Sequence, residues 1–153
     1  KKTGRPVLSK QYECTWNDKK YNAVTDSYMV FMTQNNIDGF EPLSKEETKP
    51  NIERMLNICK LLPSDVTGVS QIDIDELKTQ AKKSFKDDIN FGTYKLFNSY
   101  VDAKRLLTVL ECMDYKYKDI VINVPKENYK PIMFRSTDLK SYAILCPIRH
   151  NEA

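Results

Sequence analysis

Residues 98–149 read NSYVDAKRLLTVLECMDYKYKDIVINVPKENYKPIMFRSTDLKSYAILCPIR, and this stretch decides the fold. Its first part carries apolar side chains at the three- and four-residue spacing of one buried helix face. These are Tyr100, Ala103, Leu106, Leu107, Leu110 and Met113. Asn98 or Ser99 can cap the first turn of this helix, and Asp102 suits the positive end of its dipole.

After the helix, the pattern changes to the two-residue period of strands. Apolar side chains alternate in residues 120–124 and 132–135, and residues 142–148 are mostly apolar. Residues 126–128 and 136–138 supply the turns between these three strands. A helix and an antiparallel meander must bury their apolar sides against each other. The sequence therefore predicts an α+β fold, an antiparallel sheet with helices packed on one face.

The first half of the chain also places strands beside a helix. Residues 6–15 are expected to form a strand, and residues 21–33 one or two more, with a bulge or tight bend at residues 25–27. Residues 34–48 are expected to be a loop that leads into a helix over residues 50–62. The apolar stripe of that helix consists of Ile52, Met55, Leu56, Cys59 and Leu62.

The middle of the chain is more polar and is expected to hold short elements. The pattern predicts a loop over residues 64–70, a helix over residues 76–84 and a strand over residues 91–97. Asp73 or Asp75 can cap the helix, because Asp73 stands three residues before a glutamate, close to a capping box.

Composition limits the classes to which the protein can belong. The 153 residues have the length of one domain, and 41% hydrophobic with 29% charged residues indicates a globular chain. The net charge of +3 is too small to require nucleic acid as a partner, and no apolar run is long enough for a bilayer. The four cysteines form no CxxC pair and are expected to be buried free thiols in a reducing, cytoplasmic compartment. They are Cys14, Cys59, Cys112 and Cys146. The chain begins at Lys1, so an earlier signal peptide or trimmed segment stays open.

Motifs of catalysis are mostly absent from the sequence. None of the four glycines is spaced as a phosphate loop, and a single histidine cannot build a histidine-rich metal site. Cys146 and His150 could form a nucleophile pair, but a buried thiol beside a solvated tail explains them more simply. The aspartate pairs 73/75 and 87/88 are explained by a helix cap and a turn. We therefore expect neither enzyme activity nor a metal or cofactor.

Five segments spread over most of the chain carry the most specific strings. They are GRPVL at 4–8, AVTDSY at 23–28, PNIERML at 50–56, FNSYVD followed by a leucine pair at 97–107, and YAILCPIR at 142–149. In this order they resemble the RPVL strand, ATDGHR turn, PDYRRVLP segment, FNxxYLLDAL helix start and YxxxxPxR strand of the bacterial sliding clamp, the beta subunit of DNA polymerase III. The chain resembles a divergent, single-domain relative of that family, with a DNA-clamp-like fold.

The sequence also departs from the family's pattern. Ser27-Tyr28-Met29 stand where the family has Gly-His-Arg, and the helix that precedes RPVL in the family is missing. The family carries three such domains in each chain, whereas residues 1–153 have room for one. Residues 34–90 fit the family poorly and are expected to be an inserted or rearranged region. A closed ring would therefore require several copies of this chain.

The resemblance implies a protein that does no chemistry. Sliding clamps surround duplex DNA with helices that line a hole, and they tether a polymerase by raising its local concentration. Their DNA contacts are non-specific, so basic residues on helices are expected to meet phosphates. The candidates are Lys78, Lys82, Lys83, Lys104 and Arg105, although solvated helix faces explain them equally well.

The resemblance also implies a pocket for a short peptide of a polymerase or another clamp-binding protein. Its residues come from the ATDGHR turn, the PDYRRVLP segment and the C-terminal strand. Carried over by motif, they are Thr25, Ser27, Tyr28, Pro50, Arg54, Met55, Leu145, Pro147, Ile148 and Arg149. Core packing is the simpler explanation for Met55, Leu145 and Ile148.

Three functions stay open at the level of the sequence. The first is a DNA-encircling or DNA-associated processivity factor, and the second is a clamp-fold module that binds a protein partner without forming a ring, as in a phage or mobile element. The third is an unrelated α+β enzyme. The number of copies in solution separates the first two, and a deep polar pocket with convergent ionisable groups would favour the third.

Overall fold

A computed structural model of the chain describes residues 10–25, 28–35, 37, 41–42, 52–83 and 92–148. Its main feature is an eight-stranded sheet with the strand order β4-β1-β2-β3-β10-β9-β8-β5. The strands are β1 Lys10–Trp16, β2 Lys19–Thr25, β3 Met29–Thr33, β4 Glu41–Pro42, β5 Ser64–Gly68, β8 Ile120–Pro125, β9 Ile132–Ser136 and β10 Ser141–Leu145. All neighbours are antiparallel except β4, which pairs parallel to β1.

The sheet consists of two three-stranded meanders, β1-β2-β3 and β8-β9-β10, joined through their third strands. Phe31 on β3 lies opposite Ala143 on β10. On either side, Val24 pairs with Phe31 and Phe134 pairs with Ala143. All four side chains belong to the same core. The strand order and directions are therefore symmetric about the β3–β10 pair, as if a two-fold axis passed through it.

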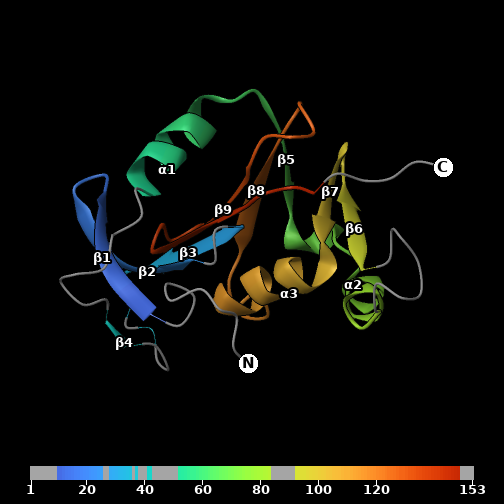
Figure 1. Cartoon of the computed structure of the whole chain (residues 1–153), viewed down its shortest axis with the longest axis horizontal. Coiled ribbons are helices and arrows are strands. Elements are labelled where there is room, and N and C mark those ends of the chain that lie inside the picture. The colour runs from blue at the N-terminus through green and yellow to red at the C-terminus, as the bar shows by residue number, and fades with distance from the viewer. Residues whose placement is uncertain are drawn as a thin grey trace.

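Three helices and a hairpin accompany the sheet. They are α1 Ile52–Leu61, α2 Ile74–Ala81, α3 Ala103–Cys112 and the hairpin β6 Thr93–Leu96 with β7 Ser99–Asp102. A short 3-10 turn, η2 Val69–Gln71, leads from β5 towards α2. In Figure 1, α1 lies on one side of the sheet, whereas α2 and α3 lie on the other. The α+β fold with helices packed on an antiparallel sheet is confirmed, but the helices are not confined to one face.

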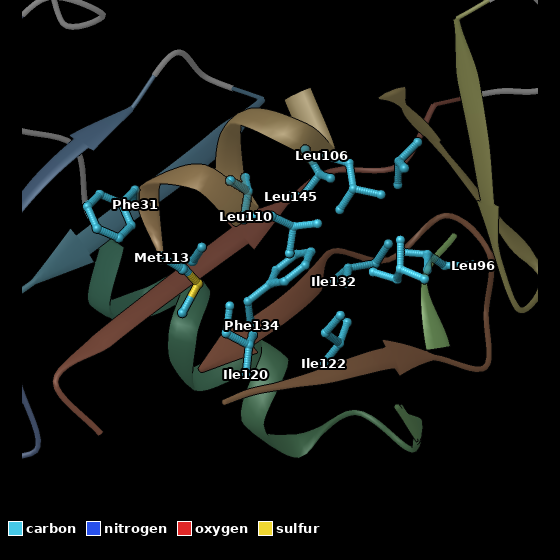
Figure 2. Packing of buried hydrophobic residues seen from close by; sticks show 14 of the residues in the cluster. Phe31, Leu96, Leu106, Leu110, Met113, Ile120, Ile122, Ile132, Phe134 and Leu145 are labelled. Carbon is cyan, nitrogen blue, oxygen red and sulfur yellow. The ribbon is translucent and has the colours of Figure 1, made fainter. Parts of the chain in front are cut away.

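The larger core lies between α3 and the C-terminal meander (Figure 2). Leu106, Leu110 and Met113 point from α3 towards Phe134 and its neighbours on the strands. Leu106 and Leu110 are fully buried, whereas Leu107 is only half-buried at the margin of the stripe. The predicted helix face therefore packs on the sheet as the periodicity indicates.

The second core lies under α1 on the opposite face. Leu56 and Cys59 of α1 are buried against the aromatic side chains of the sheet. Among these, the rings of Trp16 and Tyr142 meet edge-to-face with centroids 6.4 Å apart, and those of Tyr21 and Tyr142 do so at 5.8 Å. Successive residues of a strand point to opposite faces, so β10 supplies both cores in alternation.

The start of α3 differs from the prediction. Residues 99–102 form β7, and α3 begins at Ala103 with Asp102 as its N-cap, not Asn98 or Ser99. The Asp102 carboxylate accepts a hydrogen bond from the backbone N–H of Arg105 at 3.2 Å. Pairing with β6 competes with helix formation there, and it buries Ser99 completely. The helix period alone could not reveal this pairing.

The polar segment before α2 also differs from the prediction. Residues 64–68, expected to be a loop, form β5 at the edge of the sheet and pair with β8. An edge strand has a polar, solvated side, so its sequence shows little apolar alternation. By contrast, the cap of α2 is confirmed, because the Asp73 carboxylate accepts from the backbone N–H of Glu76 at 3.0 Å.

The predicted bend after β2 is the tight turn of the β2–β3 hairpin. The Thr25 hydroxyl donates to the carbonyl oxygen of Met29 at 2.7 Å and stabilises this turn. Of the cysteines, Cys14 and Cys59 are buried, but Cys112 is exposed, so the expectation of four buried thiols is wrong there. Among the helices of the described residues, none is both long and apolar enough to cross a bilayer.

Candidate DNA and partner interfaces

The predicted phosphate contacts gather on α2 and α3. These helices pack against each other, as Figure 1 shows. Lys78 on α2, Lys82 and Lys83 just after it, and Lys104 on α3 are all exposed. None of the four forms an ion pair with any other described residue. Their ammonium groups therefore point to solvent, where an anion can meet them.

Arg105 differs from the four lysines because it is engaged within the protein. Its guanidinium Nη1 lies 3.4 Å from the Asp102 carboxylate, and its Cζ lies 4.6 Å above the ring centre of Tyr28. The side chain thus joins the start of α3 to the β2–β3 turn. A guanidinium held by a carboxylate and an aromatic ring contributes less to an external phosphate contact than an unpaired lysine.

Acidic side chains moderate the charge of the same helices. Asp75 and Glu76 are exposed in the first turn of α2, where they suit the positive end of the helix dipole. Glu111 is exposed near the end of α3. Any attraction to DNA therefore depends on the positions of the lysines, because the face as a whole is only weakly basic.

The structure brings together the two most distant segments of the predicted peptide pocket. The backbone N–H of Cys146 donates to the carbonyl oxygen of Tyr28 at 2.8 Å, and that of Ile148 donates to Tyr100 at 2.8 Å. Tyr28 and Pro147 consequently lie at one corner, beside Arg105. The Tyr28 side chain is 45% exposed there. We call Tyr28, Arg105, Pro147 and Ile148 the Tyr28 corner.

Two other predicted pocket residues serve the fold. Leu145 is fully buried in the core under α3, which agrees with the core-packing explanation. Thr25 is buried, and its hydroxyl holds the β2–β3 turn. Neither side chain presents a surface to a peptide. Ser27, Pro50 and Arg149 lie outside the described residues.

Arg54 and Met55 lie on α1, which covers the face opposite α3. Arg54 is exposed, whereas Met55 is half-buried against the second core. Burial raises the pKa of the Cys59 thiol to about 11, and nearby Cys146 adds to this rise. The end of α1 therefore approaches the end of β10, but Met55 does not belong to the Tyr28 corner.

The candidate catalytic groups mostly serve structural roles or lie beyond view. Asp73 caps α2, as the simpler explanation requires. His150 and the aspartates at 87 and 88 lie outside the described residues. Within the described ranges, no group of three or more histidine, cysteine, aspartate or glutamate side chains could hold a metal ion.

A polar depression beside the β6–β7 hairpin was missed by the sequence analysis. It has a volume of about 430 Å³ and lies between the β6–β7 turn and the β8–β9 turn. Its lining residues are Lys95, Asn98, Tyr100, Lys126, Glu127, Asn128 and Tyr129. The signal was present as two turns that each carry an asparagine beside lysine and tyrosine, but residues 126–128 were interpreted only as a turn.

Comparisons with protein-family models, with curated proteins and with solved structures found no match to this chain.

Proposed function

We propose that this chain is a non-catalytic, clamp-like protein that associates with duplex DNA through α2 and α3 and tethers a protein partner. The observation that carries the proposal is the symmetric sheet, in which two meanders meet through β3 and β10. It supports the resemblance because the halves of the chain were expected to repeat strands beside a helix. A second support is that α3, which follows the clamp-like string at residues 97–107, presents Lys104 to solvent.

The proposed contact with DNA is electrostatic. Lys78, Lys82, Lys83 and Lys104 would each approach a backbone phosphate and release a condensed counterion. Such contacts do not distinguish sequences, so the protein can move along the duplex. A partner held at the same time rebinds its DNA substrate at a high effective concentration, which is how a tether increases processivity without chemistry.

Fluorescence anisotropy with two unrelated duplexes tests the DNA contact. The double variant Lys82→Glu/Lys83→Glu should weaken binding to both duplexes equally, by about tenfold or more, because it replaces two attractions with two repulsions. The matched control is Lys19→Glu/Lys20→Glu at the β1–β2 turn, where both lysines are also exposed. Equal losses in the two variants would show that only net charge matters and would contradict an interface on α2 and α3.

The second candidate function is a partner-binding module that forms no ring. The Tyr28 corner favours it, because an exposed aromatic ring lies beside a half-buried proline and isoleucine. A peptide that carries a clamp-binding sequence should then bind without DNA. Tyr28→Ala should weaken that binding, whereas Tyr117→Ala, which removes a ring that is 84% exposed elsewhere, should not. Unchanged peptide binding in Tyr28→Ala would exclude this corner.

A further inference from the structure

The depression between the β6–β7 and β8–β9 turns has preformed walls. On one side, the backbone N–H of Ala103 donates to Gly92 at 2.7 Å, and the buried Leu96 fixes the hairpin to the larger core. On the other side, the backbone N–H of Lys126 donates to Pro63 at 3.1 Å. The Lys126 ammonium also lies 2.9 Å from the Asp65 carboxylate on β5. A ligand therefore meets a site whose backbone is already in place.

The depression carries positive charge next to aromatic rings. The Lys95 ammonium lies 5.4 Å from the ring centre of Tyr100, and the Lys130 ammonium lies 5.4 Å from that of Tyr129. Within the part of the chain that the structure describes, neither lysine forms an ion pair. These two charges are thus available to an anion, in contrast to Lys126, which Asp65 neutralises.

Tyr129 presents its ring to solvent in a held orientation. The side chain is 67% exposed, and its hydroxyl donates to the Glu127 carboxylate at 2.8 Å. This hydrogen bond, together with the charge of Glu127, raises the pKa of Tyr129 above its ordinary value. The phenol therefore stays protonated at neutral pH, and the acceptor role of Glu127 is already occupied by it.

We propose that this depression binds single-stranded nucleic acid, with backbone phosphates at Lys95 and Lys130 and an unpaired base on the ring of Tyr129. The amides of Asn98 and Asn128, which both line the site, offer donors and acceptors to a base edge or sugar. Lysines next to exposed aromatic rings are the usual combination for binding single strands without sequence preference. An exposed cation–π contact is weaker than base stacking, so the base displaces Lys130 from the ring towards a phosphate.

Two other anionic ligands fit the site less well. Duplex DNA keeps its bases paired and stacked, so it cannot use the Tyr129 ring. An acidic peptide could pair with Lys95 and Lys130 but has no flat group for the ring, and it would be repelled by Glu127. The single strand uses both the charge and the ring, and this inference does not depend on the proposed contact of α2 and α3 with duplex DNA.

Fluorescence anisotropy with a labelled oligothymidylate of about ten nucleotides tests the proposal. Tyr129→Ala should weaken binding roughly tenfold through lost stacking. Tyr129→Phe, which keeps the ring, should bind like the unchanged protein. Lys95→Ala should lower the slope of log K against log salt concentration by about 0.7, the value for one phosphate contact on a single strand.

The matched control is Lys116→Ala/Tyr117→Ala, which removes an exposed lysine and an exposed tyrosine elsewhere. It should leave oligothymidylate binding unchanged, whereas Lys95→Ala/Tyr129→Ala should abolish it. Equal binding by both double variants would overturn the proposal, as would displacement of the oligonucleotide by poly-glutamate as readily as by unlabelled oligothymidylate. Lys82→Glu/Lys83→Glu provides the distinction from the duplex contact, because it should weaken duplex binding and leave the single strand bound through Tyr129.

Discussion

At the scale of single residues, burial separates two neighbouring leucines of α3. Leu106 is fully buried, whereas Leu107 is half-buried at the margin of the core. Leu106→Ala should lower the free energy of unfolding by about 2–5 kcal/mol, because the closed core cannot collapse onto the lost volume. Leu107→Ala should cost clearly less and serves as the matched control in urea unfolding. Similar losses for the two variants would contradict the packing of α3 on the sheet.

A second residue-scale prediction concerns the carboxylate of Asp138 in the β9–β10 turn. Hydrogen bonds from the Ser136 hydroxyl and the backbone N–H of Lys140, with the ion pair to Lys118, lower its pKa from 3.8 to about 2. Its stabilisation is therefore complete above pH 3.8 and is lost as the pH falls towards 2. Asp138→Asn should be less stable than the unchanged protein at pH 7, by a small amount because solvent screens the group. In thermal unfolding, a difference that persists undiminished near pH 2 would exclude this carboxylate as its source.

At the scale of elements, the junction of β7 and α3 depends on one cap. Asp102→Ala should lower the free energy of unfolding by about 0.5–2 kcal/mol, since the first turn of α3 loses its acceptor. Asp102→Asn keeps an N-cap oxygen and loses only the exposed pair with Arg105, so it should change stability by less than about 1 kcal/mol. Asn98→Ala should leave the helix unaffected, although Asn98 was a cap candidate. A larger effect at Asn98 than at Asp102 in chemical unfolding would contradict the observed helix start.

At the scale of the whole molecule, the number of copies decides between the proposed functions. The chain has a mass of 17.8 kDa and the length of one domain, so DNA can be encircled only by several copies. We expect light scattering to give a multiple of this mass. We also expect the protein to stay on circular plasmid DNA and to leave it when the plasmid is cut, because a ring slides off a free end. A monomer that binds the peptide but not DNA would favour the partner-binding module instead.

The candidate sites were predictable only in part. The resemblance predicted that Tyr28 and Pro147 share a corner, and the hydrogen bond between Tyr28 and Cys146 brings them there. It did not predict that Met55 packs on the opposite face, because the direction in which α1 crosses the sheet is not encoded in its own stripe. The polar depression at Tyr129 could not be predicted either, since each turn supplies only half of the lining.

The sequence by itself determined the buried stripe of α3 and the three strands after it. These elements follow from local periodicity, because a helix or strand must turn its apolar side chains towards one face. The tertiary structure decided which residues became β5 and β7 and which face α1 covers. The physical reason is that the energy of these elements comes from partners far along the chain. Pairing of β5 with β8 satisfies the backbone of a segment that has no apolar alternation of its own, and pairing of β7 with β6 outweighs the helix signal at residues 99–102.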